Sequence, residues 1–170
     1  MSYSLEKEIA VQAVLKACKL CQSVRRSMIL DEVMLKEDKS PVTIADFGSQ
    51  ALIIDELHKH FSKDPIIAEE DATELLTLEN IPVRESVYQQ VQEVSPSLTE
   101  EEIIDAIQRG NYTGQGVGRQ WVLDPIDGTK GFLRNGQYAV ALALIEDGKI
   151  VLGILGCPNL SIDLNDPESS

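Results

Sequence analysis

The chain has 170 residues, of which 15 are Lys or Arg and 28 are Asp or Glu, so its formal net charge at pH 7 is −13. This acidity disfavours binding to nucleic acid or to an anionic membrane, because phosphate groups would repel the chain. The hydrophobic content of 43% is that of a globular protein, and no apolar run approaches the roughly 20 residues that a membrane helix needs. Three cysteines and no apolar leader predict a reducing, cytoplasmic setting.

The first part of the chain is predicted to be mainly helical. Apolar residues recur every three or four positions over residues 4–28, as on one face of a helix. A polar loop over residues 34–41 follows. A second helix is predicted to begin at Thr43, because Thr43 fits the N-cap position and Asp46 lies three residues later.

The second part is predicted to add helices and then a sheet. A weak helical pattern covers residues 83–94, and Thr99 with Glu102 forms the capping box of a further helix. Apolar, β-branched runs predict strands over residues 65–68, 119–123, 138–145 and 149–155. Together these elements indicate a mixed α+β domain over residues 1–160, followed by a polar tail over residues 161–170. Because such a short sheet leaves an apolar face uncovered, we expect the tail to be a truncation point in a larger fold.

The strongest candidate for a ligand-binding segment is Asp124-Pro125-Ile126-Asp127-Gly128-Thr129, because two carboxylates lie close to a glycine. Gly128 allows a sharp turn and the close approach of a ligand. Thr129 is expected to cap the turn that follows, so that the N–H groups of Gly128 and Thr129 face the same space as the carboxylates. Such a site offers oxygen ligands to a hard cation such as Mg²⁺ and amide donors to a phosphate. The same residues also fit an ordinary Asp-rich turn after a strand.

Two further carboxylate positions lie at the ends of predicted elements. Glu69 and Glu70 follow the first apolar strand, and Asp46 lies in the first turn of the second helix. Taken singly, the pair fits a solvated strand end and Asp46 fits helix capping. Together the three segments predict carboxylates that converge from separate elements, and the lack of His or Cys beside them favours Mg²⁺ over Zn²⁺.

These three motifs, in this order, resemble those of the Mg²⁺-dependent, lithium-sensitive phosphomonoesterases of the inositol monophosphatase family. Residues 124–129 with Phe132 are similar to the family signature, Glu69-Glu70 to its second acidic motif, and residues 41–46 to its first. The likeness runs from about residue 5 to residue 160. It implies the N-terminal αβ half of a layered αβαβα sugar-phosphatase fold, with the C-terminal half absent.

Within the family, the residues around the signature resemble the branch of 3′(2′),5′-bisphosphate nucleotidases. The similar segments are residues 118–123, 129–134, 136–143 and 156–159. The resemblance implies that the substrate is a small nucleotide. The implied reaction is hydrolysis of adenosine 3′,5′-bisphosphate, and of its sulfated form, at the 3′-phosphate. Adenosine 3′,5′-bisphosphate would give AMP and phosphate. The implied roles are sulfur assimilation and salt tolerance.

The resemblance also assigns metal ligands by position. Glu69, Asp124 and the carbonyl oxygen of Ile126 would hold one Mg²⁺ ion. Asp124 would bridge to a second Mg²⁺ ion, which Asp127 also binds. The loop at residues 35–40 resembles the mobile flap of the family, which could bring a third ion.

The catalytic roles implied by the resemblance fall on neighbouring residues. Thr129, oriented by Asp46, would position the attacking water, and the amides of Gly128 and Thr129 would hold the phosphate. The chain departs from the family in one respect, because the family has a further Asp ligand in a downstream Trp-Asp motif. Here the only tryptophan, Trp121, is followed by Val122, so we expect no activity from these 170 residues alone.

Three functions remain open on the sequence. The chain fits a bisphosphate nucleotidase or its N-terminal part, a phosphatase of inositol phosphates, or a non-catalytic acidic chain that binds divalent ions. No feature of the sequence sets an oligomeric state.

Overall fold

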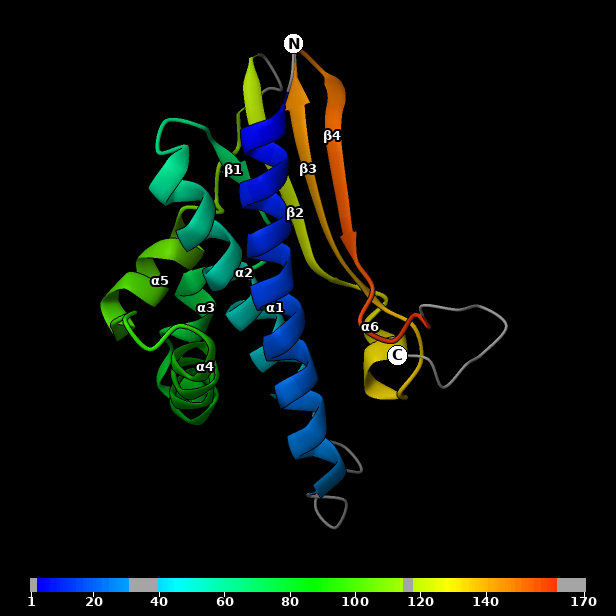
Figure 1. Cartoon of the computed structure of the whole chain (residues 1–170). Coiled ribbons are helices and arrows are strands. Elements are labelled where there is room, and N and C mark those ends of the chain that lie inside the picture. Colours follow the sequence, from blue (N-terminus) through cyan, green and yellow to red (C-terminus); the bar gives the residue numbers. More distant parts are fainter. Residues whose placement is uncertain (1–2, 31–39, 115–117, 162–170) are drawn as a thin grey trace.

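The computed structural model describes residues 3–30, 40–114 and 118–161. The elements in these ranges are α1 (Ser4–Leu30), α2 (Ser40–His60), β1 (Ile66–Ile67), α3 (Ala72–Leu75), the 3₁₀ helix η1 (Leu78–Asn80), α4 (Ile81–Val94), α5 (Glu100–Gln108), β2 (Arg119–Asp127), α6 (Thr129–Leu133), β3 (Ala139–Glu146) and β4 (Lys149–Gly156). The predicted mixture of helices and sheet is confirmed, and Figure 1 shows that α1 and α2 lie against the sheet.

The four strands form one mixed sheet in the order β1-β2-β3-β4. β1 runs parallel to β2, whereas β2, β3 and β4 follow one another antiparallel. The β3–β4 hairpin turns at Asp147 and Gly148, whose φ angles are +47° and +75°. An Asp-Gly pair suits this turn because both central positions need a positive φ.

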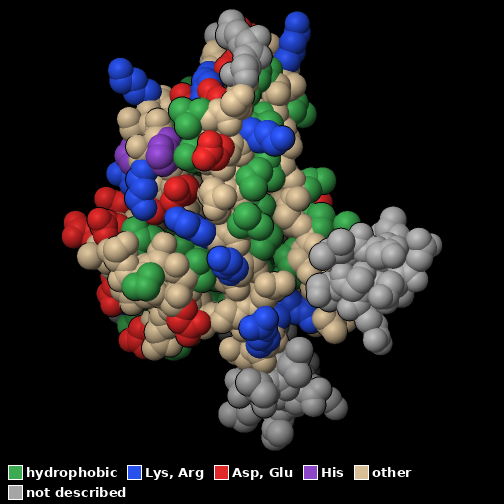
Figure 2. All heavy atoms as spheres, viewed as in Figure 1, with side chains coloured by type: hydrophobic (Ala, Val, Ile, Leu, Met, Phe, Trp, Pro, Cys, Tyr) green, Lys and Arg blue, Asp and Glu red, His purple; other side chains and the backbone are tan. Residues whose placement is uncertain are grey.

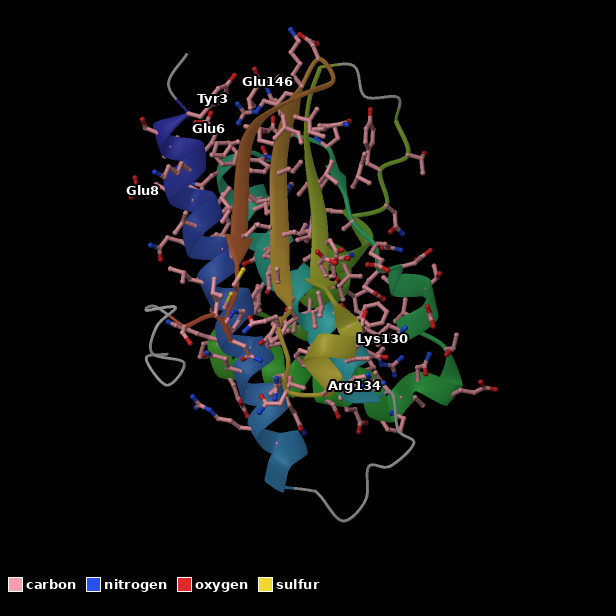
Figure 3. All side chains as sticks on the ribbon, turned by 90° about the vertical axis from the view of Figure 1, so that its right-hand side faces the viewer. Tyr3, Glu6, Glu8, Lys130, Arg134 and Glu146 are labelled. Carbon is pink, nitrogen blue, oxygen red and sulfur yellow. The ribbon has the colours of Figure 1, made fainter. Side chains whose placement is uncertain are left out.

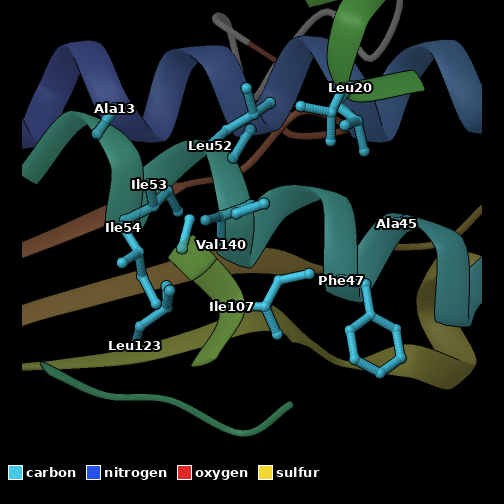
Figure 4. Close-up of a cluster of buried hydrophobic side chains, with 14 of the residues drawn as sticks. Ala13, Leu20, Ala45, Phe47, Leu52, Ile53, Ile54, Ile107, Leu123 and Val140 are labelled. Atoms are coloured by element: carbon cyan, nitrogen blue, oxygen red, sulfur yellow. The ribbon is translucent and has the colours of Figure 1, made fainter. Parts of the chain in front are cut away.

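The hydrophobic core lies between the sheet and the helices, with α2 at its centre. α2 packs against α1, β2, α4 and α5. A helix covered on several sides must be apolar nearly all round, and residues 51–54 of α2 are accordingly four buried apolar residues in succession. Figure 4 shows side chains from five elements meeting in this core, among them Leu20, Ile53, Ile107, Leu123 and Val140.

The start of α2 differs from the prediction. The helix begins at Ser40 rather than at Thr43, so Thr43 lies within the first turn and is not the N-cap. Pro41 is compatible with this start, because the N–H groups of a first helical turn have no partner within the helix. The rest of the predicted loop and flap, residues 34–39, lies outside the described residues.

The junction between β2 and α6 also differs from the prediction. β2 does not end at residue 123 but continues to Asp127. Gly128, with a φ of +90°, is the N-cap of α6, so Thr129 is the first helical residue and not the cap. Glycine occupies this position because its missing Cβ removes the strain of a left-handed backbone.

The sheet face turned away from α1 and α2 carries exposed apolar side chains. Ala141, Ala143 and Gly153 line a shallow apolar hollow there, together with Leu155. Leu155 is 69% exposed at the rim of this face. Asp124 borders the same hollow, so the apolar face reaches the first carboxylate of the signature segment.

The surface of the molecule reflects its acidic composition. Figure 2 shows Asp and Glu side chains gathered over α4 and α5, whereas hydrophobic side chains appear nearer the middle of the same view. None of the described helices combines the length and the apolar character that crossing a membrane requires.

Candidate functional site

The signature segment, residues 124–129, joins the end of β2 to the start of α6. Three steps along β2 from Asp124 to Asp127 match only two steps along β3, so β2 bulges at Pro125 and Ile126. A bulge suits Pro125, which has no N–H for the strand ladder. Oδ1 of Asp124 accepts a hydrogen bond from the N–H of Ile126 at 3.1 Å, which orients the Asp124 carboxylate. Asp124 is half-buried and Asp127 is exposed.

The acidic loop after β1 is positioned by the buried side chain of Gln50 on α2. Nε2 of Gln50 donates to the carbonyl oxygen of Glu70 at 2.8 Å, and Oε1 accepts from the N–H of Glu70 at 2.9 Å. Nε2 also donates to the carbonyl oxygen of Ile107 at 3.1 Å. The backbone of Glu70 is thereby fixed to α2, and Glu69 with it.

Asp46 lies one helical turn before Gln50 and is half-buried. Burial raises the pKa of Asp46 to about 8, and neighbouring carboxylates add to this effect. These neighbours are Glu70, Glu69 and Asp124. Asp46 therefore lies in the electrostatic field of carboxylates from both other acidic segments.

The other two segments show the same mutual repulsion. Burial raises the pKa of Glu70 to about 7, and the charges of Glu69 and Glu74 raise it further. Burial also raises the pKa of Asp124, and the charges of Glu69 and Asp127 contribute. Carboxylates that repel one another in this way are stabilised by a bound proton or a bound cation.

We define the acidic cluster as Asp46, Glu69, Glu70, Asp124 and Asp127. Its donors are all oxygen atoms, which suit a hard divalent cation such as Mg²⁺. Among the described residues, no group of three His, Cys, Asp or Glu side chains lies close enough to hold a metal ion. The oxygen donors thus suit a hard cation by their chemistry, but the described side chains do not form a three-ligand site, so the ligand set Glu69, Asp124, Ile126 and Asp127 stays a prediction.

The residues expected to bind phosphate lie at the start of α6. Gly128 and Thr129 are exposed, and α6 packs against α2, which carries Asp46. The carbonyl oxygen of Gly128 accepts hydrogen bonds from the N–H groups of Gly131 and Phe132, which closes the first turn of α6. The pairing of Thr129 with Asp46 stays a prediction.

Glu70 and Gln50 lie beside the predicted site residues, although the sequence pattern predicted no role for either. Glu70 is half-buried, and burial raises its pKa to about 7, whereas Glu69 is exposed. Gln50 is fully buried and holds the loop that carries both. The signal for Gln50 was a polar residue one turn after Asp46, immediately before the apolar run at residues 51–54.

Comparison with known proteins places these observations in a family. The model of the inositol monophosphatase family matches residues 3–165. The 3′(2′),5′-bisphosphate nucleotidase of Schizosaccharomyces pombe is 46% identical over 184 aligned residues, which cover 100% of this chain and 52% of that protein. The 3′(2′),5′-bisphosphate nucleotidase 1 of Arabidopsis thaliana is 45% identical, with 95% of this chain and 49% of that protein covered. The chain thus spans about half the length of the curated relatives it matches.

Solved structures show the same fold at lower sequence identity. Inositol monophosphatase II from Staphylococcus aureus superposes with a TM-score of 0.56 at 17% identity, over 91% of this chain and 41% of that chain. CysQ from Bacteroides thetaiotaomicron, a bacterial member of the inositol monophosphatase family, superposes with a TM-score of 0.53 at 22% identity, over 92% and 43% respectively. The order of motifs, the fold and the family match agree. The chain therefore belongs to the inositol monophosphatase family.

Proposed function

We propose that this chain carries the cation-binding and phosphate-binding residues of a Mg²⁺-dependent 3′(2′),5′-bisphosphate nucleotidase. The observation that carries the proposal is the acidic cluster, in which carboxylates from α2, from the loop after β1 and from the end of β2 share one electrostatic field. The names of relatives at 45% and 46% identity support a nucleotide as the substrate. The proposed reaction releases the 3′-phosphate of adenosine 3′,5′-bisphosphate and leaves AMP. The 5′-phosphosulfate form of adenosine 3′,5′-bisphosphate is the proposed second substrate. Its hydrolysis would link the activity to sulfur assimilation.

In this proposal the acidic cluster binds two Mg²⁺ ions. Glu69, Asp124 and the carbonyl oxygen of Ile126 would hold one, and Asp124 with Asp127 would hold the other. Bound Mg²⁺ supplies charge neutralisation on the phosphate oxygens and lowers the pKa of a coordinated water. The repulsion among the carboxylates supports this assignment, because a cation between them would remove it.

The remaining steps are proposed for side chains and amides at the start of α6. The Thr129 hydroxyl would position the attacking water, and Asp46 would orient that hydroxyl by accepting its hydrogen bond. The N–H groups of Gly128 and Thr129 would donate to the phosphate oxygens. We place the reaction in the cytoplasm, which is supported by the three free thiols Cys18, Cys21 and Cys157.

Phosphate release from two substrates tests the proposed specificity. With this chain joined to the remaining half of the Schizosaccharomyces pombe relative, and with Mg²⁺ present, we expect release from adenosine 3′,5′-bisphosphate to be faster than from inositol 1-phosphate, and to stop when the metal is chelated. Asp124→Asn should abolish release, whereas the matched change Asp105→Asn on the exposed side of α5 should not. Faster release from inositol 1-phosphate would instead support an inositol phosphate phosphatase.

A second candidate is a non-catalytic acidic chain that binds divalent cations. One observation favours it: the carboxylates of the acidic cluster repel one another, and a bound cation would relieve that repulsion whether or not a reaction follows. A calorimetric titration of this chain with Mn²⁺ that shows binding, combined with no phosphate release from either substrate by the joined protein, would support this candidate over the nucleotidase.

A further inference from the structure

The turn that follows the signature segment is held by a residue from α1. The turn, residues 134–138, links α6 to β3. Nη2 of Arg25 donates a hydrogen bond to Oδ1 of Asn135, and the Arg25 guanidinium lies 5.8 Å from the centre of the Phe132 ring. Arg25 is only 8% exposed. A buried cation is costly, and these two contacts offset part of that cost, while Nη1 of Arg25 has no hydrogen-bond partner among the described residues.

Asn159, which follows β4, holds the same turn from a second element. Nδ2 of Asn159 donates to the carbonyl oxygen of Gly136 at 2.7 Å. The carbonyl oxygen of Asn159 accepts from Nε2 of Gln137 at 2.7 Å. Three successive residues of the turn, 135–137, are therefore each bonded to a residue far away in the sequence.

The turn packs directly on the backbone of the signature segment. A Cβ built on Gly131 would lie 1.8 Å from the carbonyl oxygen of Gln137, and a Cβ built on Gly128 would lie 3.4 Å from the same oxygen. The N–H of Gly136 also donates to the carbonyl oxygen of Gly131 at 2.8 Å. Because close-packed backbone atoms transmit displacements, a shift of the turn moves Gly128.

We propose that Arg25 and Asn159 are positioning residues of the phosphatase site. By fixing residues 135–137, they set where Gly128 and its neighbours in the signature lie. The inference rests on the proposed function, in which those neighbours bind cation and phosphate. Arg25 and Asn159 act through the turn, from α1 and from the end of β4, and are assigned no contact with substrate.

Four single variants test this role. Asn159→Ala removes both the donor and the side-chain volume, and Asn159→Asp keeps the shape but replaces the donor by an acceptor. Arg25→Lys keeps the charge but loses the planar fork that reaches Asn135. Gln92→Ala is the matched control, because Nε2 of Gln92 also donates to a part-buried carbonyl oxygen, that of Leu98 at 3.0 Å, between α4 and α5.

Three measurements on the whole chain separate positioning from stability: the thermal midpoint, the Mn²⁺ affinity by calorimetry, and hydrogen exchange of the amides of residues 128–138. We expect Asn159→Ala, Asn159→Asp and Arg25→Lys to weaken Mn²⁺ binding by about tenfold, the lower end of the effect of losing a direct outer-shell partner, because these residues act through the turn. Hydrogen exchange at residues 128–138 should accelerate in the same variants. Gln92→Ala should lower the thermal midpoint to a similar degree but leave the Mn²⁺ affinity and the exchange unchanged.

The outcomes distinguish this inference from the proposed function. If the Asn159 variants and Gln92→Ala have equal Mn²⁺ affinity and equal exchange at residues 128–138, the positioning role is wrong. If the unsubstituted chain binds no Mn²⁺, the proposed function fails, and the exchange data alone then decide whether Asn159 and Arg25 fix the turn. In that case too, the inference is overturned if the amides of residues 128–138 exchange as slowly in both Arg25→Lys and Asn159→Asp as in the unsubstituted chain.

Discussion

Gln50 shows how a single buried side chain can join two parts of a site. Its side-chain amide donates to the carbonyl oxygen of Glu70 and accepts from the N–H of Glu70. An aliphatic side chain can make neither hydrogen bond. Since Asp46 lies one turn earlier on the same helix, Gln50 sets the distance between the two acidic segments.

We therefore expect Gln50→Leu to destabilise the chain although the volume is nearly unchanged. Each backbone group of Glu70 left unsatisfied should cost about 1–3 kcal/mol in the free energy of unfolding. Urea unfolding measures the effect, with Gln89→Leu on the exposed side of α4 as the control. Equal midpoints for the two variants would show that the Gln50 bonds contribute nothing to stability.

Gly131 in α6 is predicted not to tolerate a side chain. A Cβ there would meet the Gln137 carbonyl oxygen at 1.8 Å, and a backbone atom cannot rotate away. We expect Gly131→Ala to lower the free energy of unfolding by about 1–3 kcal/mol. Gly153→Ala is the control, because a Cβ on Gly153 has no neighbour within 4 Å, and it should leave the urea midpoint unchanged or slightly raised. A tolerated Gly131→Ala would mean that the turn is free to move.

At the scale of elements, the capping box of α5 is a local device that the sequence predicts in full. The Thr99 hydroxyl accepts from the N–H of Glu102 at 3.3 Å, and the Glu102 carboxylate accepts from the N–H of Thr99 at 2.9 Å. Both partners are three residues apart, so the geometry needs no tertiary contact.

Removing this cap should lower the free energy of unfolding by a small but measurable amount. Thr99→Ala is expected to lower the free energy of unfolding by about 0.5–2 kcal/mol, and Thr99→Ser should restore it. Hydrogen bonds from the N–H and the hydroxyl of Thr99 lower the pKa of Glu102, so the cap contributes above the ordinary glutamate pKa near 4.3 and is lost as the pH falls below it. A Thr99→Ala variant as stable as the parent at pH 7 would contradict the assignment.

The opposite end of β2 is tied together by Arg119. Its guanidinium donates to the carboxylates of Asp64 at 2.6 Å, Glu6 at 3.0 Å and Glu146 at 3.4 Å. The hydroxyl of Tyr3 donates to Glu146 at 2.8 Å, and Figure 3 shows Tyr3, Glu6 and Glu146 close together, far from α6. The network thus joins α1, the segment after α2, β2 and β3 at the end remote from the acidic cluster.

We expect Arg119→Met to lower the free energy of unfolding at pH 7 by about 1–3 kcal/mol, because hydrogen bonds to charged groups are lost and three carboxylates remain together. The pKa of Glu6 lies below its ordinary value, owing first to its own backbone hydrogen bond and then to Arg119. Stability from this carboxylate is present above about pH 4.3 and is lost as the pH falls through its folded pKa. The difference from the parent chain should therefore shrink below pH 4 in urea titrations, whereas Arg26→Met on the exposed side of α1 should show little difference at either pH.

At the scale of the whole molecule, the uncovered sheet face is the most unusual surface. Ile150 and Leu155 are 71% and 69% exposed and flank the hollow that Asp124 borders. Contiguous exposed apolar surface of this kind binds apolar dyes in the native state. We expect native-state fluorescence of an anilinonaphthalene dye to fall in Leu155→Lys, without loss of the unfolding midpoint. A Leu76→Lys control, on an exposed leucine next to α3, should leave the fluorescence unchanged. Equal fluorescence in all three chains would exclude this face as the binding surface.

Several features were determined by the sequence alone because they depend on neighbours in the chain. The helix over residues 4–28, the α5 capping box and the Asp-Gly hairpin turn follow from periodicity, capping and turn chemistry, and the structure confirms each. The family resemblance also came from motif order, and the comparisons confirm it. The start of α2 and the cap of α6 were missed, because a first-turn proline and a left-handed glycine extended these elements beyond the predicted limits.

Which carboxylates influence one another depends on the packing of the whole chain. Asp46, Glu70 and Asp124 are far apart in the chain, and their mutual repulsion exists only once α2, β1 and β2 pack together. The same holds for Gln50, whose partners lie 20 and 57 residues away, and for the turn held by Arg25 and Asn159. Burial and long-range hydrogen bonds are properties of packing, which no local pattern of residues can encode.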